Sequence, residues 1–317
     1  MKPIKGIHHI TAMAKHPQEN VNFYHHFLGQ RLVKKTVNFD DPGTYHLYYG
    51  DHAGSPGTIM TFFPWPNAAR GQRGHGEVGA TAYTISPDAL EFWVQRLTDH
   101  QIEHNPITNR FGEHGLSFED PDGMILELIC TENTAEFSFW EDGPIPQAHA
   151  LRGFHSATLW VKSADSMSNL LTQQFGYAFM GQEDNRHRFQ SASDNLAVTL
   201  DVLEDPGLPE GRFGAGSVHH IAFRVDDDAE QLDYQETLIQ AGYRVTEVKD
   251  RNYFHSIYFR THGGVLFEIA TDPPGFSVDE PVESLGTNLK LPPWYEDQRS
   301  AIESVLPPLS TTLNESD

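Results

Sequence analysis

The chain has 317 residues, a formal net charge of −22 at pH 7 and 38% hydrophobic residues, enough apolar material for two ordinary domain cores. The acidity argues against nucleic acid or an anionic membrane surface as a partner, and the single cysteine, Cys130, excludes an intrachain disulfide and a thiolate metal cluster. No secretion-signal pattern or membrane-spanning apolar run is present, so we expect a cytoplasmic protein whose metal chemistry, if any, uses nitrogen and oxygen ligands.

Four segments of the chain share one layout, in which a short alternating strand is followed by a helix and then by three strands with turns between them. These βαβββ modules cover residues 5–65, 76–131, 151–203 and 216–273. One such module cannot bury its sheet face alone, so the modules should pair into half-barrels around a cavity. The expected fold class is therefore α+β, with four βαβββ modules in two half-barrel domains.

Two connecting segments divide the chain into halves of similar plan. Residues 132–150 form a linker between the first pair of modules (5–131) and the second pair (151–273). Residues 274–317 form a C-terminal wrapping segment and a tail. Both connectors are rich in proline and aromatic residues, which suits a segment that wraps the modules or builds a subunit contact. We therefore expect a homo-oligomer.

The opening strands of the four modules have related sequences. They read GIHHITAMA (6–14), VGATAYTIS (78–86), GFHSATLWV (153–161) and SVHHIAFRV (217–225). Alternate residues of a strand face the same side, so only one histidine of each HH pair can point into the cavity. The four strands place these residues at one equivalent position: His9, Ala80, Ser156 and His220.

A predicted helix follows each opening strand. The four helices cover residues 19–29, 86–101, 163–176 and 228–242. Gly29 is suited to end the first helix, while Ser86 as the cap and Pro87 at the first helical position are suited to start the second.

The closing strands of the modules can be aligned in the same way. They read GTIMTFF (57–63), DPDGMILELI (120–129), NLAVTLDV (195–202) and THGGVLFEIA (261–270). The alignment places these residues at a second equivalent position: Thr61, Glu127, Thr199 and Glu268.

Counting ligands predicts which modules pair. Two histidines and one carboxylate on one face, with open positions left over, are the ligand set of non-haem Fe(II) oxygenases. Consecutive pairing leaves each half-barrel one ligand short, whereas the first and fourth modules together supply His9, His220 and Glu268. Glu127 is then left without a histidine partner. The alternative is a slip of one residue in the third module, which would make His155 a ligand in place of His9.

The module layout, together with GIHHIT, VHHIAF and GGVLFEI, resembles the vicinal-oxygen-chelate superfamily and more closely its hydroquinone ring-cleaving dioxygenases. The resemblance covers nearly the whole chain, through LPPWYEDQRSAIESVLPPL (291–309). It implies Fe²⁺, with Mn²⁺ as an alternative, held by His9, His220 and Glu268, and O2 and a small aromatic molecule as substrates. The resemblance also implies these further catalytic residues: His8, Thr11, His219, Arg251 and Tyr258.

The further residues have side chains that such chemistry needs, namely proton acceptors and donors to developing negative charge. Each also has a structural alternative. A histidine beside a ligand faces away from the cavity unless a bulge intervenes, so His8 and His219 could serve packing alone. Tyr258 could be an ordinary strand aromatic, and Arg251 a solvated loop charge. His46 is a weaker candidate for the pocket wall.

Two other functions fit the same modules. A glyoxalase-type isomerase normally adds a second carboxylate ligand, and Thr61 occupies the position from which the first module would supply it. A metal-free protein that binds an aromatic drug has no need of two histidines and a glutamate together. The leading expectation is therefore a Fe²⁺-dependent dioxygenase that inserts O2 into a hydroquinone-type ring.

Overall fold

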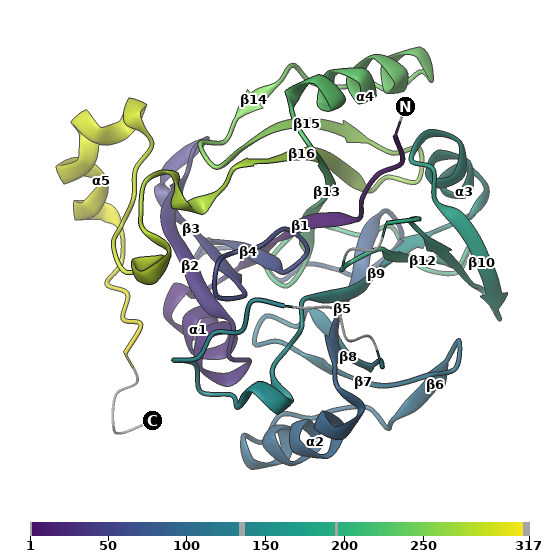
Figure 1. The fold of residues 1–317 in the computed structure, drawn as a ribbon, viewed down its shortest axis with the longest axis horizontal. Helices are drawn as coiled ribbons and strands as arrows, with labels where there is room; N and C mark the ends of the chain where they lie inside the picture. The colour runs from purple at the N-terminus through teal and green to yellow at the C-terminus, as the bar shows by residue number, and fades with distance from the viewer. Residues whose placement is uncertain (1, 133–136, 194–195, 313–317) are drawn as a thin grey trace.

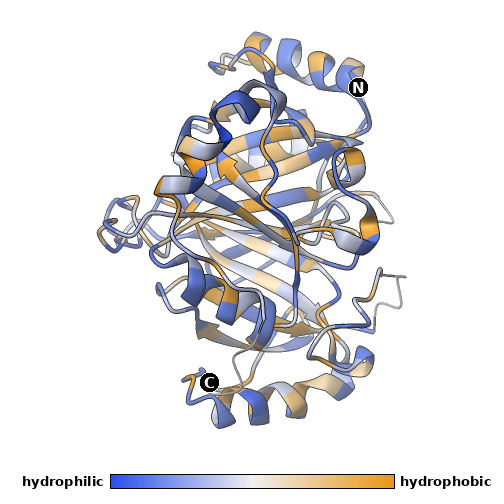
Figure 2. Cartoon of the chain, turned by 90° about the vertical axis from the view of Figure 1, so that its left-hand side faces the viewer, coloured by the Kyte–Doolittle hydropathy of each residue, from blue (hydrophilic) through white to orange (hydrophobic). Residues whose placement is uncertain are grey.

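The computed structural model describes residues 2–132, 137–193 and 196–312. Their strands form two eight-stranded sheets, each curled into a half-barrel with helices on the outside (Figure 1). In Figure 2 the strands carry much of the apolar colour, while the peripheral helices alternate polar and apolar residues, as expected for elements with one buried side. The expected α+β half-barrel fold is confirmed.

One sheet is built from the first and fourth modules. Its strands in spatial order are β14 (Lys249–Asp250), β15 (Phe254–Arg260), β16 (Leu266–Pro274), β13 (Val218–Val225), β1 (Ile7–Ala14), β4 (Ile59–Pro64), β3 (Asp41–Gly50) and β2 (Arg31–Asn38). The two modules meet where β1 runs antiparallel to β13. The predicted pairing of the first and last modules is therefore confirmed.

The other sheet is built from the second and third modules. Its strands in spatial order are β10 (Ala178–Glu183), β11 (Arg186–Gln190), β12 (Thr199–Glu204), β9 (Phe154–Val161), β5 (Glu77–Ile85), β8 (Ile125–Cys130), β7 (Glu113–Glu119) and β6 (Thr108–Arg110). Both sheets thus cross the division of the chain at residues 132–150. The role of that segment as a domain linker stays a prediction, and residues 133–136 lie outside the described part.

The helices follow the opening strands as predicted. In chain order they are α1 (Pro17–Val21) with η1 (Asn22–Phe27), η2 (Pro87–Ala89) with α2 (Leu90–Asp99), α3 (Asp165–Asn169) with η4 (Leu170–Gln174), and α4 (Asp228–Gln240). The helices of the first and third modules continue as π-helix, which the amphipathic pattern does not reveal. Ser86 is the residue before η2, but its side chain makes no capping hydrogen bond. Among the described residues, no helix is long and apolar enough to cross a membrane.

The ladder between β1 and β13 contains two matching β-bulges. Ile7 and His9 face consecutive residues of β13, so His8 is the extra residue of one bulge. His219 is the extra residue of the other, because Thr11 and Ala12 face His220 and Val218. A bulge bends the strand and re-aims the side chain that it carries. Both histidines that precede the predicted ligands therefore escape simple strand alternation.

The segment after β16 runs along the outer edge of the first sheet (Figure 1). It contains η5 (Phe276–Val278), η6 (Val282–Ser284), η7 (Pro293–Gln298) and α5 (Arg299–Val305). The fully buried Lys34 of β2 anchors it through Nζ, which lies 2.7 Å from Asp279 Oδ1 and 3.0 Å from Glu280 Oε2. The hydroxyl of Tyr295 donates to the carbonyl of Phe39, 2.9 Å away. The end of the predicted tail, residues 313–317, lies outside the described part.

Candidate metal centre

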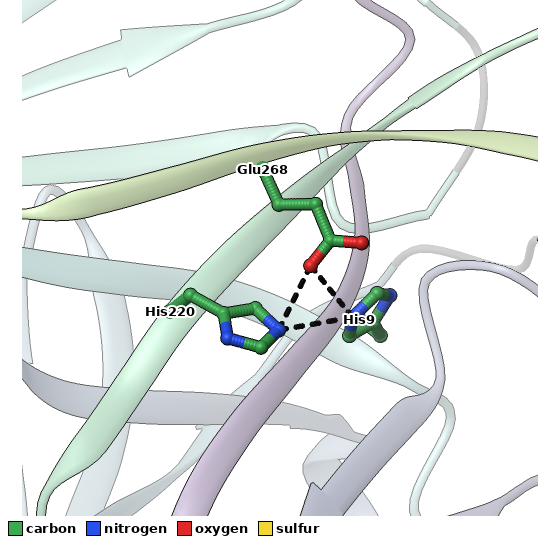
Figure 3. A group of neighbouring side chains, drawn as sticks. All are labelled: His9, His220 and Glu268. Carbon is green, nitrogen blue, oxygen red and sulfur yellow. Dashed lines mark hydrogen bonds and ion pairs between the residues drawn. The ribbon is translucent and has the colours of Figure 1, made fainter. Parts of the chain in front are cut away.

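His9 on β1, His220 on β13 and Glu268 on β16 come together inside the first half-barrel (Figure 3). The Oε2 atom of Glu268 lies 2.8 Å from His220 Nε2 and 3.4 Å from His9 Nε2. The two Nε2 atoms are 3.4 Å apart. All three side chains are buried. Three adjacent strands thus aim three potential ligand atoms at one point.

The bulge histidines hold the rings of the two potential ligand histidines. His8 Nδ1 lies 2.9 Å from His9 Nδ1, and His219 Nδ1 lies 2.7 Å from His220 Nδ1. Each contact engages the Nδ1 atom of the potential ligand histidine, so its Nε2 atom is left to bind a metal. Fixing a metal-binding histidine through its other nitrogen is how proteins set ring orientation.

Glu268 is oriented in a similar way. The hydroxyl of Ser256 on β15 donates to Oε1, whereas Oε2 has no partner with hydrogen-bond geometry. Burial alone would raise the pKa of this carboxyl, but the neighbouring His9 and His220 outweigh burial and hold the pKa well below its usual range. The carboxylate is therefore ionised although its side chain is fully buried.

The residues present fit a divalent transition metal. A buried carboxylate oxygen without a hydrogen bond is unfavourable unless a cation balances it. Here that oxygen faces the Nε2 atoms of two imidazole rings whose Nδ1 atoms are already engaged. Two histidines and one carboxylate on one face are typical of Fe²⁺ sites with open coordination positions.

A cavity of about 320 Å³ opens beside these potential ligands. His219, Arg251 and Tyr258 line it next to the ligand histidines, and aromatic side chains form much of the wall: Phe39, Phe63, Trp65 and Phe254. The turn between β2 and β3 forms another side, where Asp40 lies 3.1 Å from the Arg251 guanidinium. The site therefore combines an apolar wall with a few converging polar groups, as small-molecule sites do.

Arg251 and Tyr258 form one unit. Tyr258 lies directly opposite Glu268 in the β15–β16 ladder, and its hydroxyl accepts a hydrogen bond from Arg251 Nε at 3.1 Å. Burial, followed by the charge of Glu268, raises the pKa of this phenol above its ordinary value. Tyr258 therefore stays protonated and can donate.

The structure places the remaining predicted residues around the ligands. Burial is the main cause that lowers the pKa of His219 to about 3. Burial also holds the pKa of His8 well below its usual value, so both side chains are neutral at pH 7. Thr11 lies two residues after His9 and directly opposite His220 in the β1–β13 ladder. Its hydroxyl accepts a hydrogen bond from Thr61 at 3.1 Å.

The sequence pattern misses one residue of the site and gives only a weak indication of another. Ser256, which holds Glu268, was not singled out, although it lies two residues before Tyr258 and so shares its strand face. His46, a weak candidate by sequence, lines the cavity and contacts Tyr48 and Thr61 through its two ring nitrogens.

The second half-barrel holds ion pairs at the equivalent place. Glu127 is paired with Arg110, so it is not an isolated acid. The alignment of Thr199 with Glu268 is wrong by two residues. Glu268 lies opposite Ala222 in the β13–β16 ladder. The residue equivalent to Ala222 in the third module is Thr158, and it lies opposite Asp201 in the β9–β12 ladder. The register of this ladder has no signal in the sequence.

The charges of this second cluster are balanced. Asp201 lies 2.8 Å from Arg188 Nε and 3.2 Å from Arg186 Nη1. His155, the rival ligand, lies in this other sheet, where Nε2 is 3.0 Å from Glu113 and Nδ1 is 2.9 Å from Ser156. It is the extra residue of a bulge, like His8 and His219, and it does not approach Glu268.

Comparison with known proteins gives consistent results. Residues 6–128 and 153–269 match the Glyoxalase/Bleomycin resistance protein/Dioxygenase superfamily. A Bacillus subtilis (strain 168) protein named "Putative ring-cleaving dioxygenase MhqO" is 48% identical over 307 residues, 97% of each chain. The "Chlorohydroquinone/hydroquinone 1,2-dioxygenase" of Sphingobium indicum is 37% identical over 299 residues, 92% of this chain and 93% of that protein. The crystal structure of a "putative dioxygenase" from Bacillus subtilis has a TM-score of 0.95 at 47% identity, covering 99% of this chain and 100% of that chain.

Proposed function

Because the chain belongs to the glyoxalase/bleomycin resistance protein/dioxygenase superfamily, we propose that it is a Fe²⁺-dependent dioxygenase that cleaves a hydroquinone-type ring. The observation that carries the proposal is the buried cluster of His9, His220 and Glu268 beside an aromatic-walled cavity. The printed names of the relatives from Bacillus subtilis and Sphingobium indicum support ring cleavage and this substrate class.

His9, His220 and Glu268 are the proposed metal ligands. A ferrous ion held there would supply the one-electron chemistry that allows O2 to react with an aromatic ring. The protein contributes orientation, since His8 and His219 hold the ligand rings and Ser256 holds the carboxylate. These contacts fix the donor atoms before substrate arrives.

Arg251 and Tyr258 are the proposed stabilisers of negative charge. Because Arg251 donates to the Tyr258 oxygen, the phenolic hydrogen stays available for an acceptor in the cavity. A phenol and a guanidinium in a buried site stabilise charge that develops during reaction without needing to reorganise. His219, which also lines the cavity, is a neutral polar group suited to orient the ring.

A hydroquinone would be held at the metal through one oxygen. The second hydroxyl of a hydroquinone lies across the ring, so it cannot share a metal with the first. The aromatic wall can hold the ring face, and polar groups around it must then set its angle. Thr61 occupies the place of a further carboxylate ligand and instead bonds to Thr11, which disfavours a glyoxalase-type isomerase.

The test is anaerobic loading with Fe²⁺, followed by oxygen-electrode measurements with hydroquinones and catechols. We expect stoichiometric oxygen uptake with at least one hydroquinone and none with Zn²⁺-loaded protein. Isomerisation of a glutathione hemithioacetal without oxygen uptake would contradict the proposal in favour of a glyoxalase. Tight binding of aromatics to metal-free protein without any turnover would contradict it in favour of a binding protein.

A further inference from the structure

We propose that His46 is a positioning residue, which together with Tyr48 and Thr61 orients the hydroxyl of Thr11 as a hydrogen-bond donor beside the metal ligands. The inference rests on the proposed function, because it gives Thr11 a substrate oxygen to bind. It is carried by an unbroken row of hydrogen bonds that begins at Tyr48 and ends at Thr11.

The directions of these hydrogen bonds follow from the donor count of each group. Thr61 has one hydroxyl hydrogen, and it donates this hydrogen to Thr11 Oγ1 at 3.1 Å. The 2.7 Å contact between His46 Nε2 and Thr61 Oγ1 must then be donated by the imidazole. His46 is therefore the Nε2–H tautomer, and its Nδ1 accepts from the Tyr48 hydroxyl at 2.8 Å.

This arrangement leaves one hydrogen unused. The Thr11 hydroxyl accepts from Thr61, so its own hydrogen must point elsewhere, and among the described residues it has no recorded acceptor. Thr11 lies two residues from His9, on the same face of β1. A hydroxyl at that place can donate to an oxygen of a molecule bound beside the ligands.

The pseudo-symmetry of the half-barrel supports a role for this row at the site. Tyr48 lies opposite Thr61 in the β3–β4 ladder, just as Tyr258 lies opposite Glu268 in the β15–β16 ladder. Two residues before each tyrosine, His46 bonds to Thr61 and Ser256 bonds to Glu268. The fourth module uses this place to orient a proposed ligand. The first module uses it to orient a threonine.

The ring of His46 is also held by packing. Its centroid lies 4.0 Å from that of Tyr48 and 4.3 Å from that of Phe63. Tyr48, Thr61 and Thr11 are all buried, so water does not compete for their hydrogen bonds. His46 itself is half-buried, and its ring is fixed by this packing and by hydrogen bonds at both nitrogens, which is what positioning requires.

The first test reads the tautomer of His46 directly. Two-dimensional ¹⁵N–¹H spectra of Zn²⁺-loaded protein, assigned with a His46→Gln variant, should show protonated Nε2 and unprotonated Nδ1. Tyr48→Phe should shift the Nδ1 resonance, whereas Tyr49→Phe is the matched control, because that buried tyrosine bonds to Asn20 instead. A protonated Nδ1 would overturn the proposal, and this result does not depend on turnover.

The second test is a double-mutant cycle on the iron-loaded enzyme. Thr61→Val removes the donor to Thr11, so the Thr11 hydroxyl is no longer oriented toward a substrate oxygen. Losing one hydrogen bond to a negatively charged substrate oxygen should lower kcat about tenfold or more, with unchanged iron content. Thr61→Ser should recover most of it. In a Thr11→Val background, Thr61→Val and His46→Leu should have little further effect. Losses that multiply independently would show that the row does not act through Thr11 and would overturn the proposal.

Discussion

His8 and His219 occupy matching bulges on the two central strands of the first sheet, and each faces the Nδ1 atom of the histidine that follows it. Strand alternation would turn both rings away from the cavity. The bulges re-aim both rings onto the Nδ1 atom of the next histidine, so each HH pair provides one potential ligand and the residue that orients it. This relationship explains why two adjacent histidines occur twice in the chain.

The proposed metal ligands can be tested by substitution. His9→Ala, His220→Ala and Glu268→Ala should each abolish tight Fe²⁺ binding, because each removes one of three buried donor atoms. Metal content after anaerobic loading and desalting is the measurement. His155→Ala is the control and should bind iron fully, since that side chain belongs to the other sheet. Iron retained by His9→Ala but lost by His155→Ala would contradict the assignment.

Tyr258→Phe and Arg251→Ala should leave iron bound but slow ring cleavage. Losing one preorganised donor to developing charge commonly lowers kcat by about 10²–10³. Stopped-flow measurement of single-turnover ring opening would isolate the chemical step. Tyr49→Phe is the control for removal of a buried phenol. Normal turnover in both site variants would assign Tyr258 and Arg251 a structural role only.

His219→Ala should impair hydroquinone cleavage more than catechol cleavage. A catechol can be aligned by two oxygens on one metal, whereas a hydroquinone depends on polar groups of the protein for its angle. The measurement is kcat/KM from oxygen consumption with both substrates on iron-replete enzyme. Thr11→Ala should show the same preference. A larger loss with catechol would contradict the proposed substrate class.

Glu113→Gln should cause a pH-dependent loss of stability. Burial alone would raise the pKa of Glu113, but His155 and Arg188 outweigh burial and lower the pKa from 4.5 to about 2. A carboxyl group whose pKa is lower in the folded state stabilises the fold fully when the pH is above its pKa in the unfolded state. This stabilisation is lost as the pH falls through its pKa in the folded state. We expect a deficit of about 1–3 kcal/mol at neutral pH, after screening, that shrinks between pH 4.5 and 2.

Urea unfolding at several pH values measures this deficit. The control is the same substitution in a protein that also carries His155→Gln and Arg188→Gln, where the two groups that lower the pKa are absent. The pH-dependent difference should largely disappear there. A deficit that stays constant from neutral pH to pH 2 would show that Glu113 acts through packing.

Lys34→Met should destabilise the protein and loosen its C-terminal segment. The substitution leaves Glu280, which is buried, without its cation, and breaking a buried pair from one side costs about 3–5 kcal/mol. Thermal unfolding and hydrogen exchange over residues 276–291 would report both effects. A second substitution, Glu280→Gln, should restore part of the stability. Unchanged exchange in the single variant would show that other contacts hold the segment.

Much of the fold follows from short-range patterns in the chain. The repeated opening phrase identifies four modules, and counting ligands identifies the first and fourth modules as partners, as the sheet order confirms. The position of Asp201 could not be predicted, because the register of the β9–β12 ladder has no signal in the sequence. The ion pair of Glu127 with Arg110 joins different strands and is likewise a tertiary feature.

The wall of the cavity was harder to predict than the ligands. The potential ligands lie within recognisable sequence motifs. The contact of His46 with Thr61 depends instead on the register that places Tyr48 opposite Thr61. The bulges at His8 and His219 have no sequence signal of their own, since the same HH pair is compatible with a regular strand. Side-chain direction at such points depends on strand pairing between distant modules.

The pairing of the first and last modules also affects how the protein matures. β1 is synthesised early, but its neighbour β13 follows it by more than 200 residues, and Glu268 follows later still. While the nascent chain is on the ribosome, one edge of β1 therefore has no native partner, and an open edge can pair wrongly with another chain. His9, His220 and Glu268 can therefore come together only after β16 has been made. Closure of this sheet and assembly of the three potential ligands are thus late events that depend on the same strand pairing.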